Sequence, residues 1–176
     1  MRIERAQTAA LIVDYQEKLV PVMSEKETLI HNSEILIKGL KVLDIPMYIT
    51  QQYTKGLGTS IKEITDAVED DAYTDKLSFT AYDCIQDKIS SKKFIVVCGI
   101  EAHICVLQTV IDLKAAGFVP VLVADCISSR KESDKHVALE RARQEGAIVT
   151  TYESLLFELL KEAGTETSKQ IQRLIR

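Results

Sequence analysis

The sequence predicts a single three-layer αβα domain with a mostly parallel, doubly wound sheet, and two observations support this. Short apolar, β-branched segments alternate with longer segments of helical periodicity. Two of the apolar segments, Ile95–Val97 and Val121–Val123, contain no polar residue. Unbroken apolarity indicates that a strand is covered on both faces, which a parallel sheet between two layers of helices provides.

The elements follow in order from these patterns. Strands are expected at Thr8–Val13, Pro46–Gln51, Lys93–Cys98, Val119–Ala124 and Ala147–Thr150. Between them, apolar residues recur at spacings of three and four, which is typical of helices with one buried face. These helices are expected at Glu25–Leu43, Ile61–Val68, Ala81–Ser90, Ile104–Ala116, Ser133–Gln144 and Tyr152–Ala163. A glycine follows each of the last three and favours helix termination there.

Residues 1–164 are expected to form one domain, because no linker, repeat or low-complexity segment divides them. Residues 165–176 form a C-terminal tail with Ile171, Leu174 and Ile175 among polar residues. We expect this tail to pack on a neighbouring subunit.

Composition excludes several classes of partner. The chain has 176 residues and a net charge of −4, so it lacks the concentration of Lys and Arg that nucleic acid or an anionic membrane surface requires. Nowhere do 18 apolar residues run together, and the first apolar segment stops at Asp14, so neither a membrane span nor a signal-peptide core is expected. A cytoplasmic location is the resulting expectation.

Cysteine and histidine spacing disfavours a metal or redox site. Cys84, Cys98, Cys105 and Cys126 contain no CxxC pair, so free thiols in a reducing compartment are expected. The three histidines are scattered and form no ligand cluster, and no GxGxxG follows the first strand. The sequence therefore predicts neither a metal ion nor a cofactor.

Three side chains are candidates for chemistry. Asp14 directly follows the first strand, where desolvation raises the pKa of a carboxyl group and suits it to accept a proton, although Asp also caps helices. Cys105 lies near a helix start, where the helix dipole and free N–H groups favour thiolate and an oxyanion, although free cysteines are usually small buried hydrophobes. Lys76, followed by Leu77 and Phe79, is either a partner of these two or a solvated lysine.

His103 is a poor base for Cys105. Residues two positions apart in a helix are rotated by roughly 200° about its axis, so the side chains of His103 and Cys105 point apart. A nucleophilic Cys105 therefore needs a carboxylate as its base.

Three segments then combine into one pattern. The matching pieces are Leu11–Gln16, Lys76–Phe79 and Gly99–Val106, with Gln108-Thr109 and Ala124-Asp125 following. With these segments in this order, the sequence resembles the isochorismatase-like cysteine hydrolases from about Thr8 to Leu160. The resemblance implies a six-stranded sheet with Cys105 as nucleophile, Asp14 as proton acceptor and donor, and Lys76 as electrostatic partner. It also implies a cis peptide bond before Glu101 that directs the N–H groups of Glu101 and Cys105 toward an oxyanion.

Two departures narrow the expected reaction. The Asp-x-His metal site of nicotinamidases in this family is missing from residues 50–58, and true isochorismatases lack the cysteine. The chain is therefore most similar to the isochorismatase-domain-containing subgroup. We expect hydrolysis of an amide or carbamoyl-like C–N bond of a small molecule through a thioester, in a homo-oligomer (a dimer or larger).

The sequence also suggests which residues line a substrate pocket, and it leaves two other functions open. Six residues are expected to line the pocket: Gln16, Gln52, Tyr53, Phe79, Glu101 and Ile104. Gln16 and Gln52 would orient an amide or bond to water at the rim. The alternatives are a catalytically weak binding or scaffolding module and a thiol redox sensor, which would need Cys98 or Cys126 to resolve an oxidised Cys105.

Overall fold

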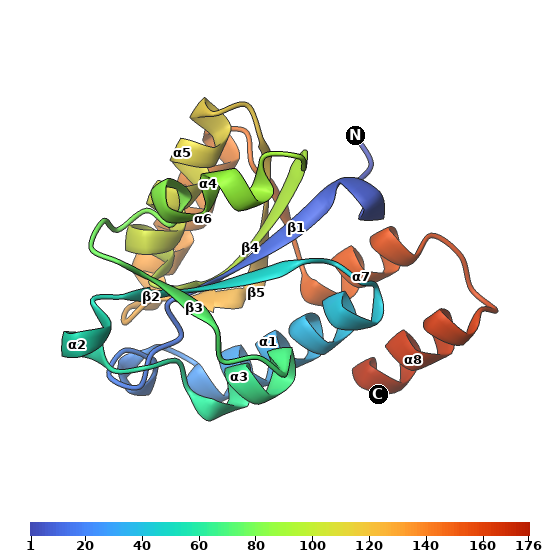
Figure 1. Ribbon diagram of the computed structural model, residues 1–176, viewed down its shortest axis with the longest axis horizontal. Helices are drawn as coiled ribbons and strands as arrows, with labels where there is room; N and C mark the ends of the chain where they lie inside the picture. Colours follow the sequence, from blue (N-terminus) through green and yellow to red (C-terminus); the bar gives the residue numbers. More distant parts are fainter.

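A six-stranded sheet forms the middle layer of the computed structural model, which describes residues 1–176 (Figure 1). All neighbouring strands are parallel, in the spatial order β3-β2-β1-β4-β5-β6. The strands are β1 (Thr8–Val13), β2 (Met47–Gln52), β3 (Tyr73–Lys76), β4 (Phe94–Ile100), β5 (Val119–Ser128) and β6 (Ile148–Thr150). Every residue of the central strands β1 and β4 is buried. The expected doubly wound αβα architecture is confirmed.

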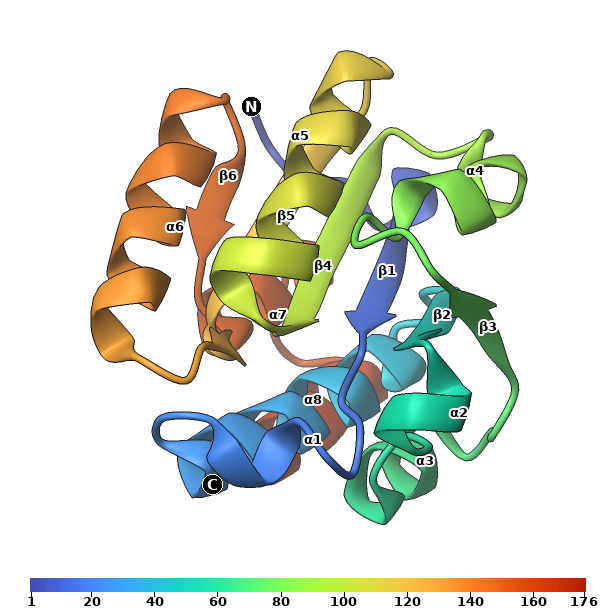
Figure 2. The ribbon, with the colours of Figure 1, turned by 90° about the vertical axis from the view of Figure 1, so that its left-hand side faces the viewer.

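Helices cover both faces of the sheet (Figures 1 and 2). One face carries α4 (Tyr82–Ile89), α5 (Leu107–Ala115) and α6 (Glu132–Gln144), and the other carries α1 (Lys26–Val42), α3 (Lys62–Val68), α7 (Tyr152–Leu160) and α8 (Glu166–Ile175). The short elements are η1 (Arg5–Gln7), η2 (Val20–Val22), α2 (Thr54–Leu57) and the π-helical turn η3 (Ala102–Val106). None of the helices is long and apolar enough to cross a membrane.

Periodicity alone missed one strand, misplaced two helix ends and ended β5 at Ala124, four residues before its end at Ser128. The edge strand β3 has the polar sequence Tyr-Thr-Asp-Lys, with only Lys76 buried, so it shows no apolar pattern. The helix expected at Ile104–Ala116 begins as η3, and α5 starts at Leu107. The helix expected to reach Ala163 ends at Leu160, because Lys161 has a left-handed backbone conformation with φ 69°.

The C-terminal tail is an amphipathic helix packed on its own chain. Thr165 caps α8 by accepting a hydrogen bond from the Ser168 N–H. Ile171 is fully buried, and α8 contacts α1 and α7. Burial of this face therefore needs no second subunit, and packing of the tail on a neighbour stays a prediction.

The sheet has its topological switch point between β1 and β4. The chain leaves β1 toward α1 on one face and leaves β4 toward α5 on the other (Figure 2). Ligands of open α/β sheets bind at the carboxyl ends of strands where connections diverge in this way.

Candidate active site

Asp14, Lys76 and Cys105 meet at this carboxyl edge. Asp14 follows β1 directly and has a left-handed backbone with φ 56°, while Lys76 is the last residue of β3 and Cys105 lies in η3 after β4. Lys76 reaches across β2, which lies between β3 and β1. Residues far apart in the sequence therefore share one site because of the strand order.

Asp14 and Lys76 form a fully buried ion pair. Asp14 Oδ2 lies 2.7 Å from Lys76 Nζ, and the Thr50 hydroxyl donates to Asp14 Oδ1 at 2.9 Å. Burial raises the pKa of Asp14 above its usual value, although Lys76 and the hydrogen bonds from Thr50 and Cys105 oppose the rise. A carboxylate with a raised pKa is a stronger base for a neighbouring thiol.

The Lys76 ammonium is held by three further acceptors. It donates to Gln52 Oε1 at 2.7 Å and to the carbonyl oxygens of Phe79 at 2.9 Å and Ser78 at 3.3 Å. These bonds fix the charge beside Asp14 and wrap the loop after β3 around it.

Cys105 rests as a neutral thiol. It is 5% exposed and hydrogen-bonds with the Asp14 side chain and the Glu101 backbone. Burial, followed by the negative charge of Asp14, raises the pKa of Cys105 to about 12, and these effects outweigh Lys76 and the Glu101 N–H. Burial beside the Asp14 carboxylate therefore outweighs the groups that favour thiolate at this turn.

Glu101 organises the turn that holds Cys105. The Ile100–Glu101 peptide bond is cis. The Glu101 carbonyl oxygen accepts from the N–H groups of Ile104 at 3.1 Å and Val106 at 3.2 Å. Its carboxylate accepts from Arg130, through the backbone N–H at 3.1 Å and Nε at 3.0 Å. The turn is thus tied to the segment after β5.

A threonine joins the cysteine turn to the loop after β3. Thr109 Oγ1 donates to the Cys105 carbonyl oxygen at 2.7 Å and accepts from the Ala81 N–H at 2.8 Å. The same loop is therefore attached to Lys76 at one end and to Cys105 at the other.

The two glutamines expected in the pocket bond to the protein itself. Gln16 Nε2 donates to the carbonyl oxygens of Gln52 at 2.9 Å and Gly58 at 2.7 Å, and its Oε1 accepts from the Gln52 N–H. Gln52 Oε1 accepts from Lys76, and its Nε2 donates to the Leu77 carbonyl oxygen at 2.8 Å. Both side chains position loops and the lysine.

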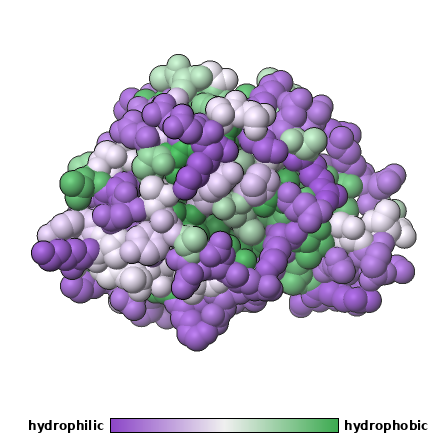
Figure 3. All heavy atoms as spheres, in the orientation of Figure 1, coloured by the Kyte–Doolittle hydropathy of each residue, from purple (hydrophilic) through white to green (hydrophobic).

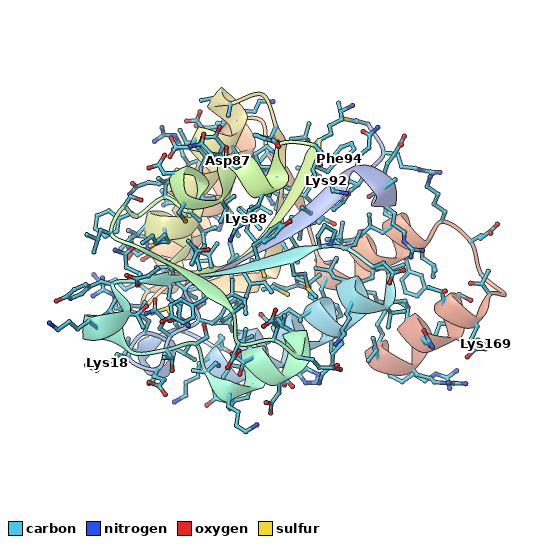
Figure 4. All side chains as sticks on the ribbon, viewed as in Figure 1. Lys18, Asp87, Lys88, Lys92, Phe94 and Lys169 are labelled. Carbon is cyan, nitrogen blue, oxygen red and sulfur yellow. The ribbon has the colours of Figure 1, made fainter.

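The other expected pocket residues differ in exposure. Tyr53 and Phe79 are exposed, Ile104 is half-buried against the apolar cluster around α5, and Glu101 is buried. Lys18 lies beside α2 (Figure 4), where its ammonium donates to the Gly56 carbonyl oxygen at 2.7 Å. The segments after β1 and β2 are therefore joined at the outer edge of the site.

His103 does not serve Cys105. Its Nδ1 lies 2.9 Å from Ser129 Oγ, and its Nε2 lies 3.9 Å from an Asp134 carboxylate oxygen. This agrees with the expectation that the two side chains diverge.

Sequence reasoning missed the functions of Thr50, Thr109 and Arg130. Thr109 stands within the matching motif, four residues after Cys105, where a hydroxyl is placed to bond the backbone one turn earlier. Thr50 pairs with Val13 in the sheet, so the β1–β2 register places it beside Asp14. No sequence signal pointed to Arg130.

Known proteins match this chain over nearly its full length. The sequence model of the isochorismatase domain matches residues 8–154. Isochorismatase domain-containing protein 2 from Homo sapiens is 31% identical over 99% of this chain and 86% of its own length. The secreted isochorismatase effector Isc1 from Phytophthora sojae is 34% identical over 94% of this chain and 82% of its own length.

A solved structure agrees in fold. The structure described as MAR1 ribonuclease from Caenorhabditis elegans has a TM-score of 0.94 and 33% identity, covering 99% of this chain and 92% of that one. Its similarity extends through the strands that position Asp14, Lys76 and Cys105. The chain belongs to the isochorismatase family and has its hydrolase fold.

Proposed function

We propose that the protein is a cysteine hydrolase that cleaves the C–N bond of a small amide or carbamoyl compound through a thioester. The single observation that supports this most is the contact chain from Cys105 to Asp14 to Lys76, which is buried at the switch point of the sheet. Such a chain contains a nucleophile, its base and a fixed cation.

Formation of the thioester uses all three groups. Asp14 accepts the thiol proton as Cys105 Sγ attacks the carbonyl carbon, and Lys76 balances the charge of the carboxylate. The N–H groups of Glu101 and Cys105 are proposed to donate to the oxyanion. The C–N bond then breaks, and the leaving amine or ammonia takes the proton from Asp14.

Hydrolysis of the thioester reverses the proton movements. Asp14 accepts a proton from water, whose oxygen attacks the thioester carbonyl. The C–S bond breaks, the acid leaves, and the proton on Asp14 returns to Cys105. The cycle balances without a metal ion, an oxidant or a cofactor.

The experiment compares Cys105→Ala with Cys84→Ala. Cys84 is a half-buried cysteine of α4 whose Sγ donates to the Ala81 carbonyl oxygen, so it serves as the matched control. Release of ammonia or amine from a panel of carboxamides, carbamoyl compounds and ureides should disappear in Cys105→Ala and persist in Cys84→Ala. Acid-quenched wild type should carry the acyl group on Cys105. Turnover by Cys105→Ala would refute the proposal.

A ribonuclease is the second candidate, because the structure from Caenorhabditis elegans is described as one. Phosphate contacts require exposed cations, whereas Lys76 is buried against Asp14 and the net charge is −4. These observations favour the amide hydrolase. RNA cleavage that survives Cys105→Ala and follows salt concentration would favour the second candidate.

We also propose a cytoplasmic homo-oligomer, a dimer or larger. Light scattering of the purified protein tests its mass, and imaging of the tagged chain in cells tests its location.

A further inference from the structure

We propose that the substrate is an uncharged amide with an apolar substituent, and that Tyr53, Leu77 and Phe79 form an apolar rim that binds this substituent. The inference rests on the proposed hydrolase function and names its substrate class. It follows from where the rim is attached, how exposed it is, and how the charges around it are paired.

The loop that carries Leu77 and Phe79 joins Lys76 to the cysteine turn. Gln52 Nε2 donates to the Leu77 carbonyl oxygen at 2.8 Å, and Lys76 Nζ donates to that of Phe79 at 2.9 Å. Two residues later, the loop is joined to the cysteine turn through the Ala81 and Thr109 hydrogen bonds. Leu77 and Phe79 therefore lie on a segment fixed at both the lysine and the nucleophile.

Tyr53 closes the rim from the other side. Its backbone N–H donates to the Lys76 carbonyl oxygen at 2.9 Å. Its ring packs so tightly over Gly56 that a Cβ at that position would overlap it. The Tyr53 backbone is thus fixed at the end of β3, and its ring lies on Gly56 of α2.

All three rim side chains are open to solvent. Leu77 is 74% exposed, Phe79 52% and Tyr53 49%. In Figure 3, hydrophobic atoms project at the left-hand edge, the side on which Figure 1 places the loop between β3 and α4. Apolar side chains grouped at a site gain from covering by an apolar ligand.

The two carboxylates beside Cys105 are already paired. Lys76 neutralises Asp14, and Arg130 neutralises Glu101. The hydrogen-bonding groups of Gln16 and Gln52 are taken by the protein. A carboxylate held beside Cys105 would lose its water and gain no free cation there, since Lys76 is taken by Asp14, and this is unfavourable. The site therefore favours neutral molecules.

The test measures alkylation of Cys105 by three reagents of one chemistry: iodoacetamide, iodoacetanilide and iodoacetate. In each case Sγ forms a C–S bond, iodide leaves, and the thiol proton passes to solvent. Rates at Cys105 are followed by peptide mass spectrometry and divided by the rate of each reagent with N-acetylcysteine. We expect iodoacetanilide to react about tenfold faster than iodoacetamide, which corresponds to about 1.4 kcal/mol, and iodoacetate about tenfold slower.

Variants assign the preference to the rim. Leu77→Ser and Phe79→Ser should bring the ratio of iodoacetanilide to iodoacetamide toward that of N-acetylcysteine. Val137→Ser changes an exposed valine of α6 and should keep the wild-type ratio. Cys84, mapped in the same samples, reports any general effect of the reagents.

Three results would overturn the proposal: equal normalised rates for the amide reagents, a preference that survives both rim variants, or unhindered reaction with iodoacetate. If a second copy of the chain covers the rim instead, Leu77→Ser should dissociate an oligomer and leave the ratio of iodoacetanilide to iodoacetamide unchanged. This result would also overturn the proposal. The hydrolase proposal fails separately, if Cys105→Ala still hydrolyses an amide.

Discussion

Replacing Asp14 by Asn separates the ionisation of Cys105 from its use in catalysis. The substitution keeps the shape of the side chain and removes the negative charge that hydrogen-bonds to the thiol. Two unit charges about 4 Å apart interact by about 4 kcal/mol at an effective dielectric constant of about 20. Since about 1.4 kcal/mol is a factor of ten, Asp14→Asn should raise the thiolate fraction of Cys105 about a thousandfold at a given pH.

The rate of amide hydrolysis should fall in Asp14→Asn although the thiolate fraction of Cys105 rises. Asn cannot accept the thiol proton or deliver it to the leaving amine, and loss of such a group costs about 10² to 10⁴ in rate. The variant should therefore alkylate faster than wild type while hydrolysing amides far more slowly. A merely structural Asp14 would not separate the two readouts.

The assay is the ultraviolet absorbance of the thiolate as a function of pH, with Cys105→Ala subtracted to isolate Cys105. Asp125→Asn is the matched control, because Asp125 is a half-buried carboxylate with a raised pKa that accepts from the Tyr152 N–H. It should leave the ionisation of Cys105 unchanged. The prediction fails if Cys105 of the Asp14→Asn protein ionises no more easily than in wild type, or if the variant retains turnover.

Three other changes should alter the pH profile, the rate and the stability of the protein. Because burial raises the pKa of Asp14, kcat/KM should fall as the pH drops through that raised pKa, and Asp125→Asn should leave the profile in place. Arg130→Gln should lower kcat about tenfold, because Glu101 loses its hydrogen bond from the arginine side chain. Arg130→Lys should restore part of the lost kcat. Arg141→Gln breaks an exposed helical ion pair and should leave kcat unchanged. Gly99→Ala should lower the free energy of unfolding by about 3 kcal/mol or more in urea, because φ is 132° there and a Cβ would overlap the Val13 carbonyl oxygen.

The central sheet could be predicted because its signals are local. β1 occurs at the expected residues, and unbroken apolarity marked β4 and β5 as buried on both faces. The edge strand β3 has water on one side and a polar sequence, so its pairing with β2 decides its structure. Tertiary contacts override weak local preference at such edges.

The proximity of Asp14, Lys76 and Cys105 could be expected from the sequence, whereas their electrostatics could not. Motif order placed Asp14, Lys76 and Cys105 at strand ends, and the strand order brings them together. The protonation of Cys105 depends on how deeply it is buried and on its distance from Asp14, which no spacing encodes. Arg130 reaches Glu101 from the segment after β5, a long-range contact with no local pattern.

The buried charge at Asp14 is a cost to the fold. Because burial raises its pKa, the native state holds this proton to a higher pH than the unfolded chain does. The native state therefore binds more protons in that interval, and the Asp14 contribution to stability falls as the pH rises through it. A domain used only for scaffolding gains nothing from this arrangement.

Replacing both charges tests that argument. Removing one partner of a buried ion pair costs about 3 to 5 kcal/mol, whereas replacing both by apolar residues is often neutral or stabilising by about 1 to 4 kcal/mol. Lys76→Met alone should therefore destabilise the protein, and Asp14→Leu combined with Lys76→Met should recover or exceed the wild-type free energy of unfolding in urea while abolishing turnover. A double variant as unstable as the single one would mean that the pair serves the fold, and the scaffolding alternative would gain. Recovery of stability without turnover would leave catalysis as the reason for a buried Asp14–Lys76 pair.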